Sequence, residues 1–192
     1  LNGVRVLLLL LDVRYARTPY GLGIDDGTAD ILGAAQWAWL RAQLDPAALA
    51  RDEVDAIVVA SGVQVLPTTR GPAENWERYP ARRRELLALL RGSRIAHILV
   101  SGDVHFSEFA QVELCSAAPR GAGLSNGERR AMELTTSGMT HSWTRQCDFI
   151  VQSHAPVTMG STARSGVNTN HRAVGKSAFA ELAFGFSRHG QQ

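Results

Sequence analysis

Three apolar runs divide the first half of the chain. They cover residues 4–11, 56–60 and 94–100. Continuous apolar runs of this length are typical of strands that are buried on both faces of a parallel sheet, where apolar and polar side chains do not alternate. The three runs therefore predict three buried strands.

Two segments between these runs have helical spacing. Residues 34–44 repeat large apolar side chains at that spacing, and the Asp45-Pro46 pair is expected to end the helix. Residues 80–91 also form an amphipathic pattern, and Pro80 suits a first helical position because its missing N–H would have no partner there. Strands that alternate with helices predict an α/β fold.

Beyond residue 100 the pattern changes from strand and helix to strand and strand. Residues 109–115 and 132–136 are rich in apolar and β-favouring side chains, and the Gly-, Ser- and Asn-rich residues 117–127 separate them. Residues 157–192 have only a weak pattern. No internal repeat or linker marks a second unit, so a single domain over residues 1–192 is expected.

The composition agrees with one folded domain. Of the 192 residues 45% are hydrophobic and 20% are charged, which suits one globular core. The formal net charge is only +2. Arginines cluster at residues 82–84, and we interpret them as a solvated helix face and not as a phosphate-backbone site, because no nucleic-acid-binding module is recognisable.

Cysteine usage and hydropathy argue against a zinc site and a membrane span. Cys115 and Cys147 lack the short spacing of metal-binding cysteines. Packed thiols are expected, with one bridge in a secreted protein as the alternative. Residues 6–11 are far fewer than the ~20 that span a bilayer. The chain opens on Leu1 without a signal-peptide pattern, so it is expected to begin inside a longer protein.

Polar side chains follow each of the three predicted strands. They are Asp12, Ser61, and Asp103 with His105. In layered α/β folds ligands bind beyond the carboxyl ends of the strands, so these side chains are expected to converge on one site.

The Asp103-Val104-His105 segment is the strongest candidate for chemistry. On an extended segment two residues that are two positions apart point to the same side, so a carboxylate and an imidazole could reach one metal ion or one pair of ions. The alternative is that Asp103 caps a turn and that His105 is a partly buried structural histidine. The segment alone does not decide between these readings.

Several longer segments together resemble a known family. They are LLDVRY at 10–15, LGAAQWAWL at 32–40, NWERYPARR at 75–83, VSGDVHFS at 100–107 and ELTTSGMTHSW at 133–143, with a fainter likeness over 170–185. In order and spacing they resemble landmarks of the PhoD-like alkaline phosphatases, which belong to the calcineurin-like metallophosphoesterase superfamily.

The resemblance implies a fold and a reaction. The fold would be the C-terminal part of a four-layer α/β/β/α sandwich with a dinuclear metal site at one edge. The reaction would be hydrolysis of small phosphate mono- or diesters by a metal-activated hydroxide. By family resemblance the metals would be Ca²⁺ and Fe³⁺, and Asp103 and His105 would be metal ligands in the late Gly-Asp-x-His element.

Two further residues are catalytic candidates. Arg14 follows the first strand and could clamp a substrate phosphate through two hydrogen bonds, or it could pair with Asp12 or another nearby acid. His141 could line the pocket or make a structural hydrogen bond. Both alternatives stay open for each residue.

The sequence departs from the family pattern at its beginning. The family's early metal-ligand motifs lie N-terminal to residues 10–15, and this chain does not contain them. Asp25, Asp26 and Asp30 are possible substitutes for the missing metal ligands. In the family likeness, however, they lie in the loop before the 32–40 segment, which is not a position of metal ligands. The chain is therefore expected to lack the N-terminal half of the domain, and a truncated or degenerate non-catalytic α/β domain is the alternative to an enzyme. An export signal, which would make the full-length protein secreted or membrane-associated, would lie upstream.

Other side chains have structural interpretations. Trp37, Trp39 and Trp76 are expected to pack in the core or a lid, Gln36 to order a loop, and His97 to lie in the core. A serine hydrolase is not supported, because no Gly-x-Ser-x-Gly elbow occurs.

Overall fold

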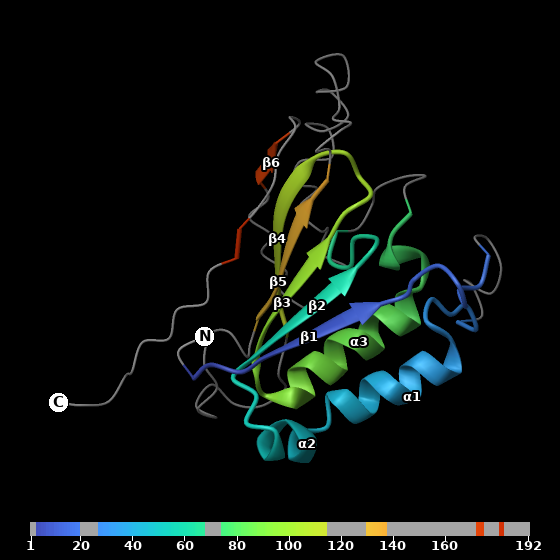
Figure 1. Ribbon diagram of the computed structural model, residues 1–192. Coiled ribbons are helices and arrows are strands. Elements are labelled where there is room, and N and C mark those ends of the chain that lie inside the picture. Colours follow the sequence, from blue (N-terminus) through green and yellow to red (C-terminus); the bar gives the residue numbers. More distant parts are fainter. Residues whose placement is uncertain are drawn as a thin grey trace.

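The computed structural model describes residues 3–19, 27–67, 74–114, 130–137, 172–174 and 181–182 (Figure 1). Within them a six-stranded sheet has the order β1-β2-β3-β5-β4-β6. The strands are β1 (Val6–Leu11), β2 (Ala56–Ser61), β3 (Ala96–Ser101), β4 (Ser107–Glu113), β5 (Arg130–Thr136) and β6 (Arg172–Val174). The predicted α/β fold is confirmed, and so are the three strands of the first half.

Parallel and antiparallel pairing divide the sheet into two parts. β1, β2, β3 and β5 pair in parallel, whereas β4 runs antiparallel to both β5 and β6. The antiparallel part corresponds to the predicted change of pattern beyond residue 100. That β5 inserts between β3 and β4 was not predicted, because spacing along the chain does not give strand order.

Helices cover one face of this sheet (Figure 1). They are α1 (Gly33–Gln43), α2 (Pro46–Arg51) and α3 (Pro80–Ser93), preceded by a 3-10 turn, η1 (Trp76–Arg78). Their buried side chains form one apolar cluster with alternate residues of the strands, and its members include Trp37, Leu40, Leu86, Leu90, Leu9, Ile57, Val59 and Leu99. Burial of Trp37 and Trp76 confirms their predicted packing role, while Trp39 is 41% exposed.

The prediction that Asp45-Pro46 only ends a helix was incomplete. The same pair also begins α2: the Asp45 carboxylate accepts hydrogen bonds from the N–H groups of Ala47 and Ala48, and Pro46 is the first helical residue. An N-cap Asp followed by Pro is a recognised helix start. The sequence therefore contained the signal for this helix.

The prediction that the first strand is buried on both faces was wrong. β1 lies at the edge of the sheet, and its Leu9 and Leu11 are buried against the helices. Leu8 and Leu10 point to the opposite face, where they are 65% and 74% exposed. The apolar run thus has one buried face and one open apolar face.

The solvated-face interpretation of residues 82–84 was correct only for Arg84. Arg82 forms an ion pair with Asp30 at 3.1 Å and lies over the ring of Trp37, 5.6 Å from its centroid. Arg83 donates from Nε to the Val65 carbonyl at 2.6 Å. A helix face that contacts a neighbouring loop uses arginine for its several directed donors.

No helix in the described ranges is both long and apolar enough to cross a membrane. A single domain over residues 1–192 remains a prediction.

Candidate functional site

The carboxyl ends of the four parallel strands are in register. Leu11 pairs with Ser61, Ser61 with Ser101, and Ser101 with Thr135. The loops that follow these strands therefore leave the sheet along one line. The loops after β1, β2 and β3 thus share one edge of the sheet, as predicted. Two of the predicted polar side chains do not meet Asp103 there, because the Asp12 carboxylate binds N–H groups of its own loop and the buried Ser61 hydroxyl donates to the Val63 carbonyl.

Asp103 and His105 lie in a turn between β3 and β4, not on an extended segment. Their φ angles are +74° and +60°, in the left-handed region that side chains other than glycine rarely adopt. The assumption that both point to one side of a strand was therefore wrong. Ser137 holds this turn, because its Oγ accepts a 3.1 Å hydrogen bond from the His105 N–H. Both side chains are exposed, and unusual backbone angles of this kind cluster at functional sites.

Arg14 connects the loop after β1 to this turn. Its Nη2 lies 3.4 Å from Asp103 Oδ1, and its Nη1 donates to Glu74 Oε2. The side chain is half exposed. Arg14 therefore does pair with an acid, but with Asp103 and Glu74 and not with the Asp12 side chain that the sequence suggested.

Glu74 is a member of the site that the sequence reading missed. It lies on the segment before η1, and its carboxylate binds two arginines: Arg14, and Arg17 through Nη1 at 3.0 Å and Nη2 at 3.2 Å. The hydrogen bonds from Arg17, with the charges of both arginines, lower the pKa of Glu74 below its ordinary value. An acid directly before the Asn75-Trp76 landmark was the only sequence signal for it.

The Asp12 carboxylate organises the first loop. Its Oδ1 accepts hydrogen bonds from the N–H groups of Tyr15, at 3.0 Å, and Arg14, at 2.9 Å, and these bonds lower the Asp12 pKa. Gln36 binds the same residue's backbone, accepting from its N–H and donating to its carbonyl, both at 2.8 Å. The predicted role of Gln36 in ordering a loop is thus confirmed.

A buried polar layer lies under the turn that carries Asp103. Glu133, on β5, is fully buried and accepts hydrogen bonds from Ser101 Oγ at 2.6 Å and from the N–H groups of Val65 and Leu66 at 2.9 and 2.6 Å. Burial raises the pKa of Glu133 above its ordinary value in spite of these donors. Because Ser101 directly precedes Gly102, this layer ties the loop after β2 to the base of the Asp103 turn.

A second buried carboxylate extends that layer. Glu108, on β4, accepts a 2.8 Å hydrogen bond from Gln64 Nε2, which also lies 3.0 Å from Thr135 Oγ1. Gln64 and Glu108 are 0% and 2% exposed. The loop after β2 is therefore fixed to β4 and β5 by side-chain hydrogen bonds.

The donor set has the right chemistry for a metal but is incomplete in the part of the chain that the structure describes. A carboxylate and an imidazole are common ligands of transition metals, and both are accessible here. No group of three or more His, Cys, Asp or Glu that could hold a metal occurs among these residues. Asp103 and His105 thus fit as part of a site that needs further ligands.

The other candidate ligands are either engaged or not described. Asp30 is used structurally: its Oδ1 accepts from Trp37 Nε1 at 2.8 Å and from the Leu32 N–H at 3.1 Å. Asp25, Asp26 and His141 lie outside the described residues, as do Cys115 and Cys147.

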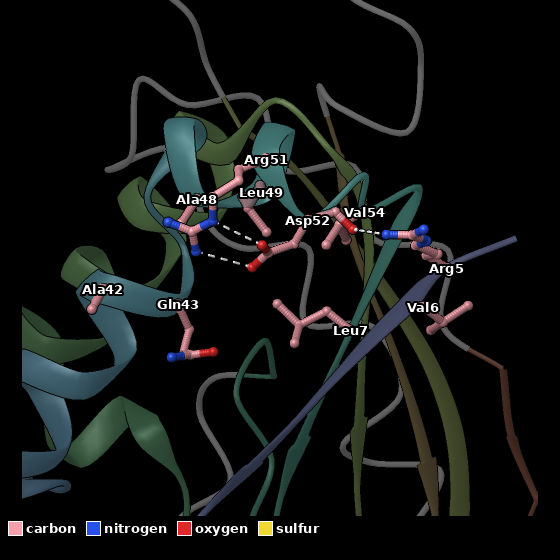
Figure 2. A pocket seen from close by; sticks show the side chains of 10 residues that line it. All are labelled: Arg5, Val6, Leu7, Ala42, Gln43, Ala48, Leu49, Arg51, Asp52 and Val54. Atoms are coloured by element: carbon pink, nitrogen blue, oxygen red, sulfur yellow. Dashed lines mark hydrogen bonds and ion pairs between the residues drawn. The ribbon is translucent and has the colours of Figure 1, made fainter.

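A pocket of about 260 Å³ lies at the other end of the sheet, between the start of β1 and the helices α1 and α2 (Figure 2). Its charged lining is already paired: Arg51 binds Asp52, with Nε to Oδ1 at 2.9 Å, and Arg5 donates to the Asp52 carbonyl at 3.0 Å. It contains none of the residues at the carboxyl ends of the strands and is a separate feature.

Comparisons with known proteins agree with the resemblance. A family model described as PhoD-like phosphatase matches residues 2–179. Among solved structures, one described as "Structure of PhoD" aligns with a TM-score of 0.53 at 16% identity, which shows a shared fold; the match covers 69% of this chain and 27% of that chain. This chain thus spans about a quarter of the length of that relative. No curated protein matches it. The chain belongs to the PhoD-like phosphatase family.

Proposed function

We propose that the protein hydrolyses small phosphate mono- or diesters in a metal-dependent reaction, and that this chain supplies the late ligand loop and a phosphate-binding arginine. The observation that carries the proposal is the position of Arg14, whose guanidinium lies 3.4 Å from the Asp103 carboxylate at the carboxyl edge of the sheet. A cation beside an accessible acid and imidazole is the arrangement that a phosphate ester and its metal ions require.

Asp103 and His105 are assigned as metal ligands. The turn between β3 and β4 presents both side chains to solvent, and Ser137 and the buried Glu133 layer hold its two ends. When bound, metal ions would neutralise phosphate charge and activate the attacking water. A dinuclear Ca²⁺ and Fe³⁺ site is the form that the family resemblance suggests, and its remaining ligands would come from residues other than those described.

Arg14 is assigned to substrate binding. Its guanidinium has five N–H donors in a planar fork, and a phosphate can accept two of them at once. Asp103 and Glu74 contact one terminal nitrogen each. The side chain is half exposed, so a substrate anion can approach it. His141 stays a prediction for the same pocket.

The open face of the sheet supports the sandwich architecture. Leu8 and Leu10 on β1 and Phe109 on β4 are exposed on elements whose other faces are buried. Exposed apolar patches on a sheet usually mark a contact surface. A second sheet packed on this face would give the four-layer α/β/β/α arrangement of the metallophosphoesterases.

The test measures metal content and turnover together in the full-length protein. His105→Ala and Asp103→Asn should each lower the bound metal per chain and reduce kcat by at least about 100-fold, because each removes a ligand. Asp52→Asn is the control, since this exposed carboxylate lies at the opposite end of the sheet (Figure 2). Metal content and rate that stay unchanged in both ligand variants would contradict the assignment. A parent protein with no metal and no turnover would instead favour the non-catalytic α/β domain.

A further inference from the structure

Glu74 joins two arginines of the same loop. Arg17 is the more buried of the two, with a side chain 22% exposed, and both its terminal nitrogens bind the Glu74 carboxylate. Arg14 is 52% exposed and binds the Oε2 atom of the same carboxylate. Glu74 therefore connects a well-anchored arginine to an accessible one.

The anchor itself is fixed from several sides. Gly33, at φ +75°, allows the start of α1 to approach this loop so closely that a Cβ there would lie 2.8 Å from the Ala16 Cβ. Thr18 accepts a 2.7 Å hydrogen bond at its carbonyl from the Tyr79 hydroxyl. The loop between Arg14 and Thr18 is thus held against the start of α1 and against Tyr79, which directly precedes α3, and Arg17 carries that rigidity to Glu74.

Arg14, which lies at the end of this series of contacts, can bind a phosphate group better if its guanidinium is already held in place. A half-exposed arginine has several rotatable bonds, and ordering them on substrate binding costs free energy. A carboxylate that already holds Nη1 leaves fewer conformations to lose. Asp103, the other partner of Arg14, is 3.4 Å away and would be engaged as a metal ligand, so Glu74 is the partner available for orientation.

We propose that Glu74 is a positioning residue that holds the Arg14 guanidinium in place for the phosphate group of the substrate. This inference rests on the proposed function and adds a residue to it. Glu74 does not contact the substrate itself; it acts through Arg14. Its removal should therefore weaken phosphate binding more than it slows the bond-breaking step.

The experiment is a double-mutant cycle with Glu74→Gln and Arg14→Ala in the full-length metal-loaded protein. KM and kcat are measured with a phosphate ester, and the Kd of inorganic phosphate is measured by calorimetry. Glu74→Gln should raise both KM and the phosphate Kd roughly fivefold, the upper range for a partly exposed ion pair, with a smaller change in kcat. In the Arg14→Ala background the same substitution should have no further effect.

Glu85→Gln is the matched control. Glu85 is also a partly exposed carboxylate between two arginines, Arg41 and Arg82, but it lies on α3 in the helix layer. It should leave KM and the phosphate Kd unchanged.

The outcomes separate the positioning role from the proposed function. If Arg14→Ala weakens phosphate binding and Glu74→Gln does not, the positioning role is overturned and the phosphate-binding arginine stands. If the effects of the two substitutions are additive, Glu74 does not act through Arg14, and the inference also fails. If Arg14→Ala binds phosphate as the parent does, the arginine assignment fails together with the role of Glu74.

Discussion

Ser101 Oγ donates a 2.6 Å hydrogen bond to the fully buried carboxylate of Glu133 on the neighbouring strand. Ser101 is the last residue of β3, directly before the turn that carries Asp103. The same carboxylate accepts hydrogen bonds from the N–H groups of Val65 and Leu66 in the loop after β2. One buried acid thus fixes the starting points of two loops at the candidate site.

Glu133→Gln should destabilise the protein by about 2–4 kcal/mol. A glutamine has only one acceptor oxygen, so its NH₂ group would face a donor and at least one buried N–H would lose its partner. The free energy of unfolding, from urea denaturation at constant pH, measures the effect. Glu53→Gln is the control, because the Glu53 side chain is exposed, as is its ion pair with Arg5, and its replacement should cause no measurable change in stability. Equal stability of the two variants would contradict a structural role for the buried carboxylate.

The buried acid could not be predicted from the sequence, although its neighbours could. Residues 132–136 were assigned to a strand because of their β-favouring side chains, and β5 confirms this. Residue type alone predicts that a charged glutamate such as Glu133 is exposed to solvent. Its partners come from segments that are more than 30 residues away, and only the folded sheet brings the donors together.

His97 supplies a pH-dependent contribution to stability. The residue is buried in β3, as the sequence indicated, and its Nδ1 lies 3.0 Å from the Ile95 carbonyl. Burial lowers the pKa of His97 below the ordinary value of 6.5. The folded state therefore binds fewer protons than the unfolded state at pH values just below 6.5.

The contribution of neutral His97 to the free energy of unfolding should be fully present above pH 6.5. It should be lost as the pH is lowered from 6.5 through the folded-state pKa of His97. The measurement compares the free energy of unfolding of the parent and of His97→Leu between pH 7.5 and pH 5, in steps of about half a unit. The free energy of unfolding of the parent minus that of His97→Leu should decrease as the pH falls, because only the parent has an imidazole whose protonation favours the unfolded state. A difference that is independent of pH would contradict the assignment. Using the difference also cancels the contribution of Glu133, whose raised pKa acts in the opposite direction.

Periodicity predicted the elements of this fold, but not the contacts between them. The strands of the first half and the two longer helices follow from local patterns of apolar residues, because those patterns decide which face is buried. The segment with Asp103 and His105 was expected to be extended, but both residues have positive φ angles and lie in the turn between β3 and β4, two strands that β5 separates in the sheet. The pairing of Arg14 with Glu74 likewise spans 60 positions in the sequence.

Arg83 and Arg84 also show that a local sequence pattern does not predict contacts between elements, and they allow a direct test. Arg83 donates from Nε and Nη2 to the carbonyls of Val65 and Leu66, both at 2.6 Å, whereas Arg84 is exposed. The N–H groups of the same two residues, Val65 and Leu66, donate to Glu133. The loop after β2 is therefore held through both its carbonyl and its N–H groups.

Arg83→Ala should lower the free energy of unfolding by about 2–4 kcal/mol, because two buried carbonyls lose charged donors and the packed side chain is removed. Arg84→Ala removes the same charge and side chain from the next position and should leave stability within about 0.5 kcal/mol of the parent. Thermal and urea unfolding of the two variants side by side makes the comparison. If they unfold alike, Arg83 contributes no more to stability than the exposed Arg84, and the loop after β2 is held without Arg83. If only Arg83→Ala is destabilised, Arg83 stabilises the loop after β2 while the neighbouring Arg84 only contacts solvent. The pattern of charges along the sequence does not distinguish these two arginines.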